Sequence, residues 1–268
     1  MSGIAFARLL VQALRAPMVL RGDRGWLRSL VQRPIVFDAV STILQLRDLR
    51  RLATLGRLES ENDPHYEAVR SYNAGVTLRK LITRTRRAED LLAALALPPC
   101  ALHGERLLLI GPRNVHELLQ AWVTGFAWRN IEAIDLYSTN SKIRVMNMEA
   151  MTHADDSFDA VLMSATLPYA KDVRGCLAEV MRVTKPGGRF VLAQTHVPEN
   201  PGYPGNLIPG DEVIVWLAEN GGELLYHHHF PRIITGGYAA TIHHIAVRKR
   251  LPTPELNGVP QSDSIDDA

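Results

Sequence analysis

Beyond residue 104 the chain alternates short apolar runs with stretches in which apolar residues recur every three or four positions. The short runs have the length expected of strands, and the periodic stretches indicate helices. The predicted strands are 106–110, 131–136, 143–146, 160–164, 189–194, 223–230 and 239–247, and the predicted helices are 116–128, 173–183 and 211–219. Strands that alternate with helices and end in a hairpin predict an α/β fold, with a seven-stranded, mostly parallel sheet and an antiparallel terminal strand.

The first hundred residues follow a different, helical pattern. In residues 35–58 apolar side chains recur at helical spacing, and residues 65–97 predict one or two further helices before two prolines end the region. The final residues are polar and lack an apolar period, which is typical of disorder. We therefore predict a helical extension over residues 1–100, a sheet domain over residues 101–250 and a disordered tail over residues 251–268.

Composition and charge fit a globular protein whose charge is unevenly distributed. Hydrophobic residues make up 46% and charged residues 22% of the chain, and no apolar run reaches the ~18 to 20 residues of a membrane-spanning helix. Residues 1–104 carry seven more positive than negative charges, whereas residues 105–268 carry five more negative than positive charges. Cys100 and Cys176 form neither a disulfide framework nor a CxxC pair. This favours a reducing compartment, and we expect a cytoplasmic protein.

Basic residues gather in the first 34 positions, which hold six arginines and a single acid, Asp23. Three interpretations stay open: an organelle transit segment, a helix on an anionic membrane surface, or the solvated face of helices that dock by their apolar side. The second would make the protein peripheral on a membrane, and the third leaves room for a protein partner. Nucleic acid is disfavoured, because these arginines lack interleaved aromatic residues and the rest of the chain is acidic.

Four stretches of the second part follow one another in a familiar order. LLLIGPRN begins at Leu107, AIDLYS at Ala133, NMEAMTHADDSFDAVLMS at Asn147 and LAEVMRVTKPGGRFVLAQTH at Leu177. The last stretch is the most specific, with a helix, a K-P-G-G turn and a strand. Over residues 104–248 this order resembles the class I methyltransferases, which are Rossmann-like proteins that use S-adenosylmethionine (SAM).

The opening loop departs from the pattern of that family. Where the family has an acid followed by glycines at alternating positions, this chain has Leu109, Gly111, Arg113 and Val115. The I-G-P-R form is similar to a variant in methyltransferase-like proteins of bacterial polysaccharide and secondary-metabolite pathways. The segment between the second and third strands is also short, and no helix is expected there.

The resemblance implies that this loop holds SAM as the cofactor. Gly111 lets the backbone approach the ligand or adopt a positive φ, and Pro112 stiffens the exit. Arg113 is expected to bind the carboxylate of the methionine end, and Glu117 its ammonium. Glu117 would repel the pyrophosphate of a dinucleotide, which tilts the site away from NAD. Asn114 with Glu117 also resembles a capping box at the helix start, and that alternative stays open.

The following strand ends supply the rest of the expected cofactor site. Asp135, at the end of the second strand, is expected to accept hydrogen bonds from both ribose hydroxyls. Asn147 and Met148 occupy the loop that would read the adenine edge, through an amide side chain and a backbone N–H. Ser164 and Ala165, after the fourth strand, are expected to lie beneath the sulfonium.

Two residues are candidates for the chemistry itself. His196 follows the fifth strand at the carboxyl edge of the sheet, and histidine titrates in the range useful for a general base. Its alternative is a loop histidine in contact with solvent. Tyr169 lies beyond the fourth strand, where many relatives place a residue that faces the substrate. Residues 196–212 hold four prolines and three glycines and are expected to form a lid over the cleft.

Histidines at positions 227–229 and 243–244 invite a metal interpretation. Because alternate residues of a strand face opposite sides, at most His227 and His229 share a face, with one partner opposite. Neither an HExxH motif nor an acid at ligand spacing accompanies them. We therefore predict no metal site and interpret these histidines as residues of a solvated edge strand.

Two functional hypotheses follow. The first is an active SAM-dependent methyltransferase that modifies a hydroxyl group of a small-molecule acceptor or of a lipid- or saccharide-linked acceptor. The second is a catalytically inactive methyltransferase-like protein that serves as an assembly, membrane-associated or scaffold subunit. The altered opening loop and the long basic N-terminal part argue for the second. Self-association into a homo-oligomer stays open, and no motif identifies the acceptor.

Overall fold

The structure, a computed structural model, describes residues 25–49, 63–79, 88–95, 102–138, 140–197, 208–233 and 239–252. The basic segment up to residue 24 and the tail from residue 253 lie outside the described residues. So does most of the expected lid, residues 198–207. The expectations made for these three segments therefore stay predictions.

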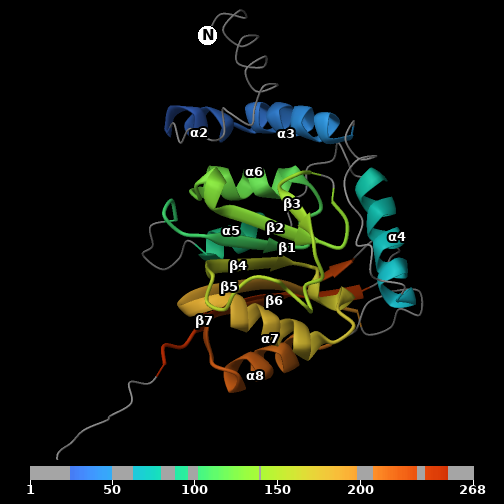
Figure 1. Cartoon of the computed structure of the whole chain (residues 1–268), viewed down its shortest axis with the longest axis vertical. Helices are drawn as coiled ribbons and strands as arrows, with labels where there is room; N and C mark the ends of the chain where they lie inside the picture. The colour runs from blue at the N-terminus through green and yellow to red at the C-terminus, as the bar shows by residue number, and fades with distance from the viewer. Residues whose placement is uncertain are drawn as a thin grey trace, which may run out of the picture.

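A seven-stranded sheet forms the centre of the molecule (Figure 1). Its strands are β1 (Leu107–Ile110), β2 (Ile131–Asp135), β3 (Ile143–Val145), β4 (Phe158–Ser164), β5 (Thr184–His196), β6 (Gly222–Ile233) and β7 (Ala239–Lys249). They lie in the order β3-β2-β1-β4-β5-β7-β6. The first five strands run parallel, and β7 pairs antiparallel with both β5 and β6. The predicted α/β fold is confirmed, and all the predicted strands are present.

The helices of the described residues cover both faces of this sheet. They are α2 (Gly25–Val31), α3 (Pro34–Leu49), α4 (Pro64–Arg79), α5 (Glu89–Leu95), α6 (Val115–Thr124), α7 (Val173–Val183) and α8 (Gly210–Glu219). As expected, the described residues between β2 and β3 form no helix. Among the residues described, no helix has the length and apolar character needed to cross a membrane.

Several element boundaries differ from the prediction, and two of the larger differences lie at glycines. The helix predicted for residues 116–128 ends earlier, because Gly125 adopts a φ of +147° and its N–H donates to the carbonyls of Ala121 and Trp122. The K-P-G-G segment, expected as a turn, lies within β5, which begins at Thr184. There Gly187 has a φ of +77°, and the pairing of β5 with β4 shifts register opposite this segment.

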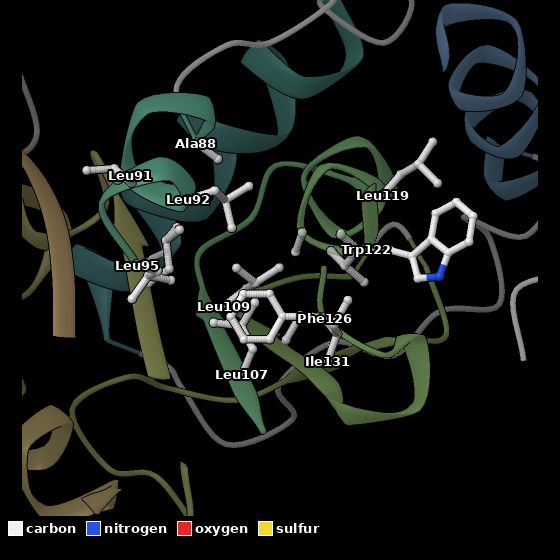
Figure 2. Close-up of a cluster of buried hydrophobic side chains, with 14 of the residues drawn as sticks. Ala88, Leu91, Leu92, Leu95, Leu107, Leu109, Leu119, Trp122, Phe126 and Ile131 are labelled. Atoms are coloured by element: carbon white, nitrogen blue, oxygen red, sulfur yellow. The ribbon is translucent and has the colours of Figure 1, made fainter. Parts of the chain in front are cut away.

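Alternation along the buried strands places one hydrophobic core on each face of the sheet. Leu107 and Leu109 of β1 share a core with α5 and α6, in which Trp122 and Phe126 are completely buried (Figure 2). Leu108, the residue between them, belongs to the second core with α7 and α8. Figure 1 shows α2 and α3 as a further layer outside α6. The sheet is thus covered on both faces, as a mostly parallel sheet requires.

Polar contacts as well as apolar packing attach α2 and α3 to the sheet domain. The Ser41 hydroxyl and Nδ1 of His116 lie 2.7 Å apart in a buried position. The rings of Phe37 and His116 meet edge to face, with centroids 4.9 Å apart. Gln32 donates to the carbonyl of Val123 at 2.9 Å. The described helices of the N-terminal part are therefore packed onto the sheet domain through side chains far apart in sequence.

Candidate functional site

A pocket opens where the carboxyl ends of β1 and β2 meet the loops after β3 and β4, with α4 forming a further wall. It encloses about 570 Å³, counting space open to solvent. Open parallel sheets bind ligands beyond the carboxyl ends of their strands, which makes this pocket the candidate site.

Gly111 lines the pocket at the end of β1 and has the backbone geometry expected of it. Its φ is +67°, in the left-handed region that favours glycine. A Cβ at this position would lie 2.3 Å from both Oγ1 and Cγ2 of Thr166. The Thr166 hydroxyl in turn donates to the carbonyl of Ser164 at 3.2 Å. Both the backbone angle and the available space therefore require glycine at residue 111.

The turn into α6 uses the expected capping residues in a shifted arrangement. The Asn114 side chain accepts from the N–H of His116 at 2.9 Å, and the Glu117 carboxylate accepts from the N–H of Arg113 at 3.3 Å. In a capping box each donor would lie one residue later. Arg113 lines the pocket, whereas Glu117 is only 1% exposed and does not line it. The structure thus brings Arg113 to the pocket and turns Glu117 toward the backbone.

Asp135, Asn147 and Met148 all line the pocket. Asp135 ends β2, and its carboxylate accepts from the N–H of Leu136 at 2.7 Å. The Asn147 side-chain oxygen accepts from the N–H of Glu149 at 3.0 Å, so it shapes this loop as an Asx-turn. Three residues expected at the cofactor are therefore brought together from two different strand ends.

Pro112 and Ser164, also expected at the cofactor, do not line the pocket. Ser164 is buried at the end of β4, and the next residue, Ala165, takes the lining position with a φ of +53°. The N–H of Ala165 donates to the carbonyl of Ala193 on β5 at 2.9 Å, which holds this uncommon backbone angle. Ser164 therefore does not face the pocket, and Ala165, which follows it, does.

α4 lies beside the loops at one end of the strands (Figure 1) and closes one side of the pocket. Its residues Tyr66 and Val69 line the pocket together with Tyr169. Nε2 of His65 lies 3.1 Å from the backbone carbonyl oxygen of Tyr169, and the ring centroids of Tyr72 and Tyr169 are 6.1 Å apart. Tyr169, the residue expected to face a substrate, is therefore also the residue that α4 packs against.

Glu149 joins α4 to the segment that precedes α7. Its carboxylate accepts from the hydroxyl of Tyr66 at 2.8 Å and from the N–H groups of Lys171 and Asp172 at 2.7 Å and 2.8 Å. The Lys171 ammonium donates to Asp63 at 2.6 Å, and this hydrogen bond lowers the pKa of the Asp63 carboxyl below its ordinary value. One carboxylate and one ion pair therefore hold the start of α4 against the pocket loops.

His196, the candidate base, does not line the pocket. It ends β5 opposite Thr241 of β7, and it is partly exposed. Gln194, two residues earlier on the same face of β5, lies opposite His243. The described residues therefore do not bring His196 and Tyr169 into one pocket.

Several lining residues were not expected from the sequence. Tyr66 and Val69 belong to a helix whose periodicity predicts that one face is buried but not where that face docks. Thr166 belongs to no motif, although its place two residues after the expected fourth strand could have suggested it. Ile110 ends β1 and Ile134 is the residue before the end of β2, and those positions alone could have assigned them to the pocket.

Comparison with known proteins agrees with this architecture. A family model described as "Methyltransferase domain" matches residues 124–192. A solved structure of geranyl diphosphate methyltransferase in complex with SAM is similar with a TM-score of 0.50 and 17% identity, over 73% of this chain and 96% of that chain. The fold is that of the class I methyltransferases.

The curated relatives match this chain only over short stretches. Demethylmenaquinone methyltransferase of Renibacterium salmoninarum is 49% identical over 45 residues, which are 17% of this chain and 19% of that protein. The uncharacterized methyltransferase YcgJ of Bacillus subtilis is 36% identical over 62 residues, which are 23% of this chain and 24% of that protein. The chain therefore spans about a fifth of the length of the curated relatives it matches. These matches indicate a methyltransferase domain without identifying an acceptor.

Proposed function

We propose that this chain is a SAM-dependent methyltransferase whose cofactor binds in the pocket between β1, β2 and α4. When bound, SAM supplies an activated methyl group on a sulfonium. The observation that carries the proposal is the pairing of Gly111 with Asp135 at neighbouring strand ends. Gly111 donates its N–H to Ile134, the residue before Asp135, at 2.8 Å. A backbone without a side chain and a carboxylate therefore lie side by side at the pocket wall.

The residues of the second and third strand ends suit a nucleoside. Asp135 accepts hydrogen bonds from the ribose hydroxyls. Met146 and Met148 are buried and line the pocket, so they offer apolar surface to a flat adenine ring. Asn147, between them, offers an amide group to the edge of that ring. The alternation of apolar and polar side chains at this loop thus matches both the face and the edge of adenine.

The opening loop suits the methionine end of the cofactor. Arg113 lines the pocket and binds the methionine carboxylate. Glu117, expected to bind the ammonium, contributes through its hydrogen bond to the Arg113 N–H, which sets the backbone of the loop. Pro112 restricts the same turn, and Ser164 positions Thr166 opposite Gly111.

The acceptor binds on the α4 side of the pocket, against Tyr66, Val69 and Tyr169. Methyl transfer needs an acceptor atom in line with the methyl group, and Tyr169 orients it. His196, at the end of β5 and outside this pocket, is the candidate base for an acceptor hydroxyl that extends beyond the pocket toward β5.

We infer a hydroxyl on a small molecule, or on a lipid- or saccharide-linked molecule, as the methyl acceptor. Two aromatic rings and a valine favour an acceptor that has apolar surface. The relative from Renibacterium salmoninarum is named for demethylmenaquinone, and this supports a small-molecule acceptor. Transfer of a labelled methyl group from SAM to acceptors of each class would identify the class.

Cofactor binding is tested by the melting temperature of the purified chain with and without SAM or its demethylated product. A ligand at 100 times its Kd stabilises the folded state by about 2.7 kcal/mol, which raises the melting temperature of a chain this size by roughly 5–10 °C. A melting temperature that stays constant at millimolar ligand would contradict the proposal and favour the inactive scaffold function.

A matched pair of variants on β2 tests whether the ligand that raises the melting temperature binds in the pocket. We expect Asp135→Asn to reduce the ligand-dependent rise in melting temperature, because Asp135 lines the pocket. Glu132→Gln should retain the rise, because Glu132 pairs with Arg106 at 2.7 Å outside the pocket. Equal rises in both variants would show that the ligand binds elsewhere.

A further inference from the structure

Three side chains from the last three elements of the sheet domain converge outside the pocket. They are Asp211 in the first turn of α8, His227 on β6 and His243 on β7. One ligand atom from each lies within 4.8 Å of the other two. In the strand register His229 is opposite His243, and His227 lies two residues along the same face of β6. The hairpin therefore presents histidines toward the helix that carries the carboxylate.

The two imidazoles are spaced like ligands of one ion. Nε2 of His227 and Nδ1 of His243 are 3.1 Å apart. Two nitrogens bound to a tetrahedral zinc ion at about 2.0–2.1 Å lie about 3.3 Å from each other, which is close to the observed separation. The rings stack with an interplanar angle of 10° and centroids 5.3 Å apart, which holds both in place.

A glycine at the start of α8 brings the carboxylate to this pair. A Cβ on Gly210 would lie 2.3 Å from Cγ and Nδ1 of His243. Because residue 210 has no side chain, the helix start packs directly on the imidazole ring, and Asp211 follows at once in the sequence. The convergence of Asp211 with the hairpin therefore depends on a close approach that only glycine allows.

We propose that Asp211, His227 and His243 bind one divalent transition-metal ion of the Zn²⁺ class, which ties α8 to the β6–β7 hairpin. Imidazole nitrogen and carboxylate oxygen are ligands that such ions take in proteins. His229, whose ring stacks on His243 with centroids 5.5 Å apart, is a further candidate donor, and water completes the coordination. The proposal does not rest on the methyltransferase function, because none of the three ligands lines the pocket.

This inference departs from the sequence-based expectation of no metal site. That expectation rested on the lack of an acid at ligand spacing in the histidine segments. The acid comes instead from a helix that precedes both strands, and only the packing of α8 on the hairpin supplies it. The competing arrangement is a direct hydrogen bond between His227 and His243, which needs a proton on one of the two nitrogens.

The test is a titration of the chain, without a histidine tag, with Zn²⁺ in competition with a chromophoric chelator. We expect one tightly bound Zn²⁺ per chain and a melting temperature that rises with Zn²⁺ and falls again with EDTA. Co²⁺ in place of Zn²⁺ should give visible absorption bands that report nitrogen and oxygen ligands. A wild-type chain that takes up no Zn²⁺ at micromolar concentration would overturn the proposal in favour of the direct hydrogen bond.

Variants on the same strand assign the ligands. His227→Ala and Asp211→Asn should each weaken Zn²⁺ binding at least about tenfold. His228→Ala is the matched control, because His228 neighbours His227 but faces the other side of β6, and it should bind Zn²⁺ as the wild type does. If His227→Ala fails to fold, Asp211→Asn decides, since Asp211 is exposed. Binding by Asp211→Asn equal to that of His228→Ala would overturn the proposal.

Discussion

At the scale of single residues, Gly111 combines two constraints that an experiment can separate. Its φ of +67° strains any other residue type, and a Cβ there would overlap the Thr166 side chain. Gly221 has a similar φ of +87°, but nothing lies within 4 Å of its Cβ position. We expect Gly221→Ala to cost about 1–2 kcal/mol and Gly111→Ala to cost a further 1–3 kcal/mol or so from overpacking. Urea unfolding of the two variants measures the difference.

The same pair of variants separates stability from ligand binding. Gly111→Ala should lose the SAM-dependent rise in melting temperature, whereas Gly221→Ala should keep it. Equal stability losses in the two variants would show that Thr166 moves aside without cost. A SAM response retained by Gly111→Ala would show that the cofactor does not approach the backbone at this residue.

The sequence places residues at the pocket most directly where a strand end determines their position. Gly111 and Asp135 directly follow or end predicted strands, and both line the pocket. Glu117 is different, because its carboxylate can reach either a ligand or a backbone N–H from the same sequence position. The turn through Pro112 and Asn114 puts the Arg113 N–H within 3.3 Å, and spacing alone does not predict that turn.

At the scale of elements, Glu149 connects α4 to the pocket loops, and two variants measure this connection. Tyr66→Phe removes one of the three hydrogen bonds that Glu149 accepts, and it should lower the free energy of unfolding by about 0.5–1.5 kcal/mol. Glu149→Ala also leaves the N–H groups of Lys171 and Asp172 without their carboxylate, so we expect a loss of about 2–3 kcal/mol. Urea unfolding gives both values.

Hydrogen exchange shows which element each change loosens. Faster exchange in α4 is expected for both Tyr66→Phe and Glu149→Ala, but faster exchange at Lys171 and Asp172 only for Glu149→Ala. If Glu149→Ala cost no more than Tyr66→Phe, water would satisfy those two N–H groups and Glu149 would not join the segments.

The position at which α4 docks on the pocket loops could not be predicted from the sequence. Helical periodicity gives a buried face, but the contacts that use this face join residues far apart in sequence. Tyr66 reaches Glu149 across 83 positions, and His65 reaches Tyr169 across 104 positions. No pattern within a single helix encodes such pairs. The strands, by contrast, follow from local apolar runs, and all seven were predicted.

At the scale of the whole molecule, the sheet was predictable because alternating strands and helices leave few topologies. The outer layer of α2 and α3 was not predictable, because a basic helix can either face solvent or dock on the sheet domain. Arg28 shows why: its guanidinium lies over the Trp122 ring at 5.6 Å and donates to the carbonyl of Phe126 at 3.3 Å. A residue that the charge pattern left open to solvent thus packs on an aromatic side chain of α6.

One sheet shared by two cores should make both sides of the molecule unfold together. Leu108 and Leu109 are neighbours on β1 and belong to opposite cores. We expect Leu108→Ala and Leu109→Ala each to lower the free energy of unfolding by about 2–5 kcal/mol, since both side chains are buried. Leu224→Ala is the control, because Leu224 is 45% exposed, and its effect should stay within about 0.5 kcal/mol. Tryptophan fluorescence and far-UV circular dichroism should report one coincident urea transition in all three variants. Transitions that separate in Leu109→Ala, but not in Leu108→Ala, would show instead that the side carrying α5 and α6 unfolds on its own.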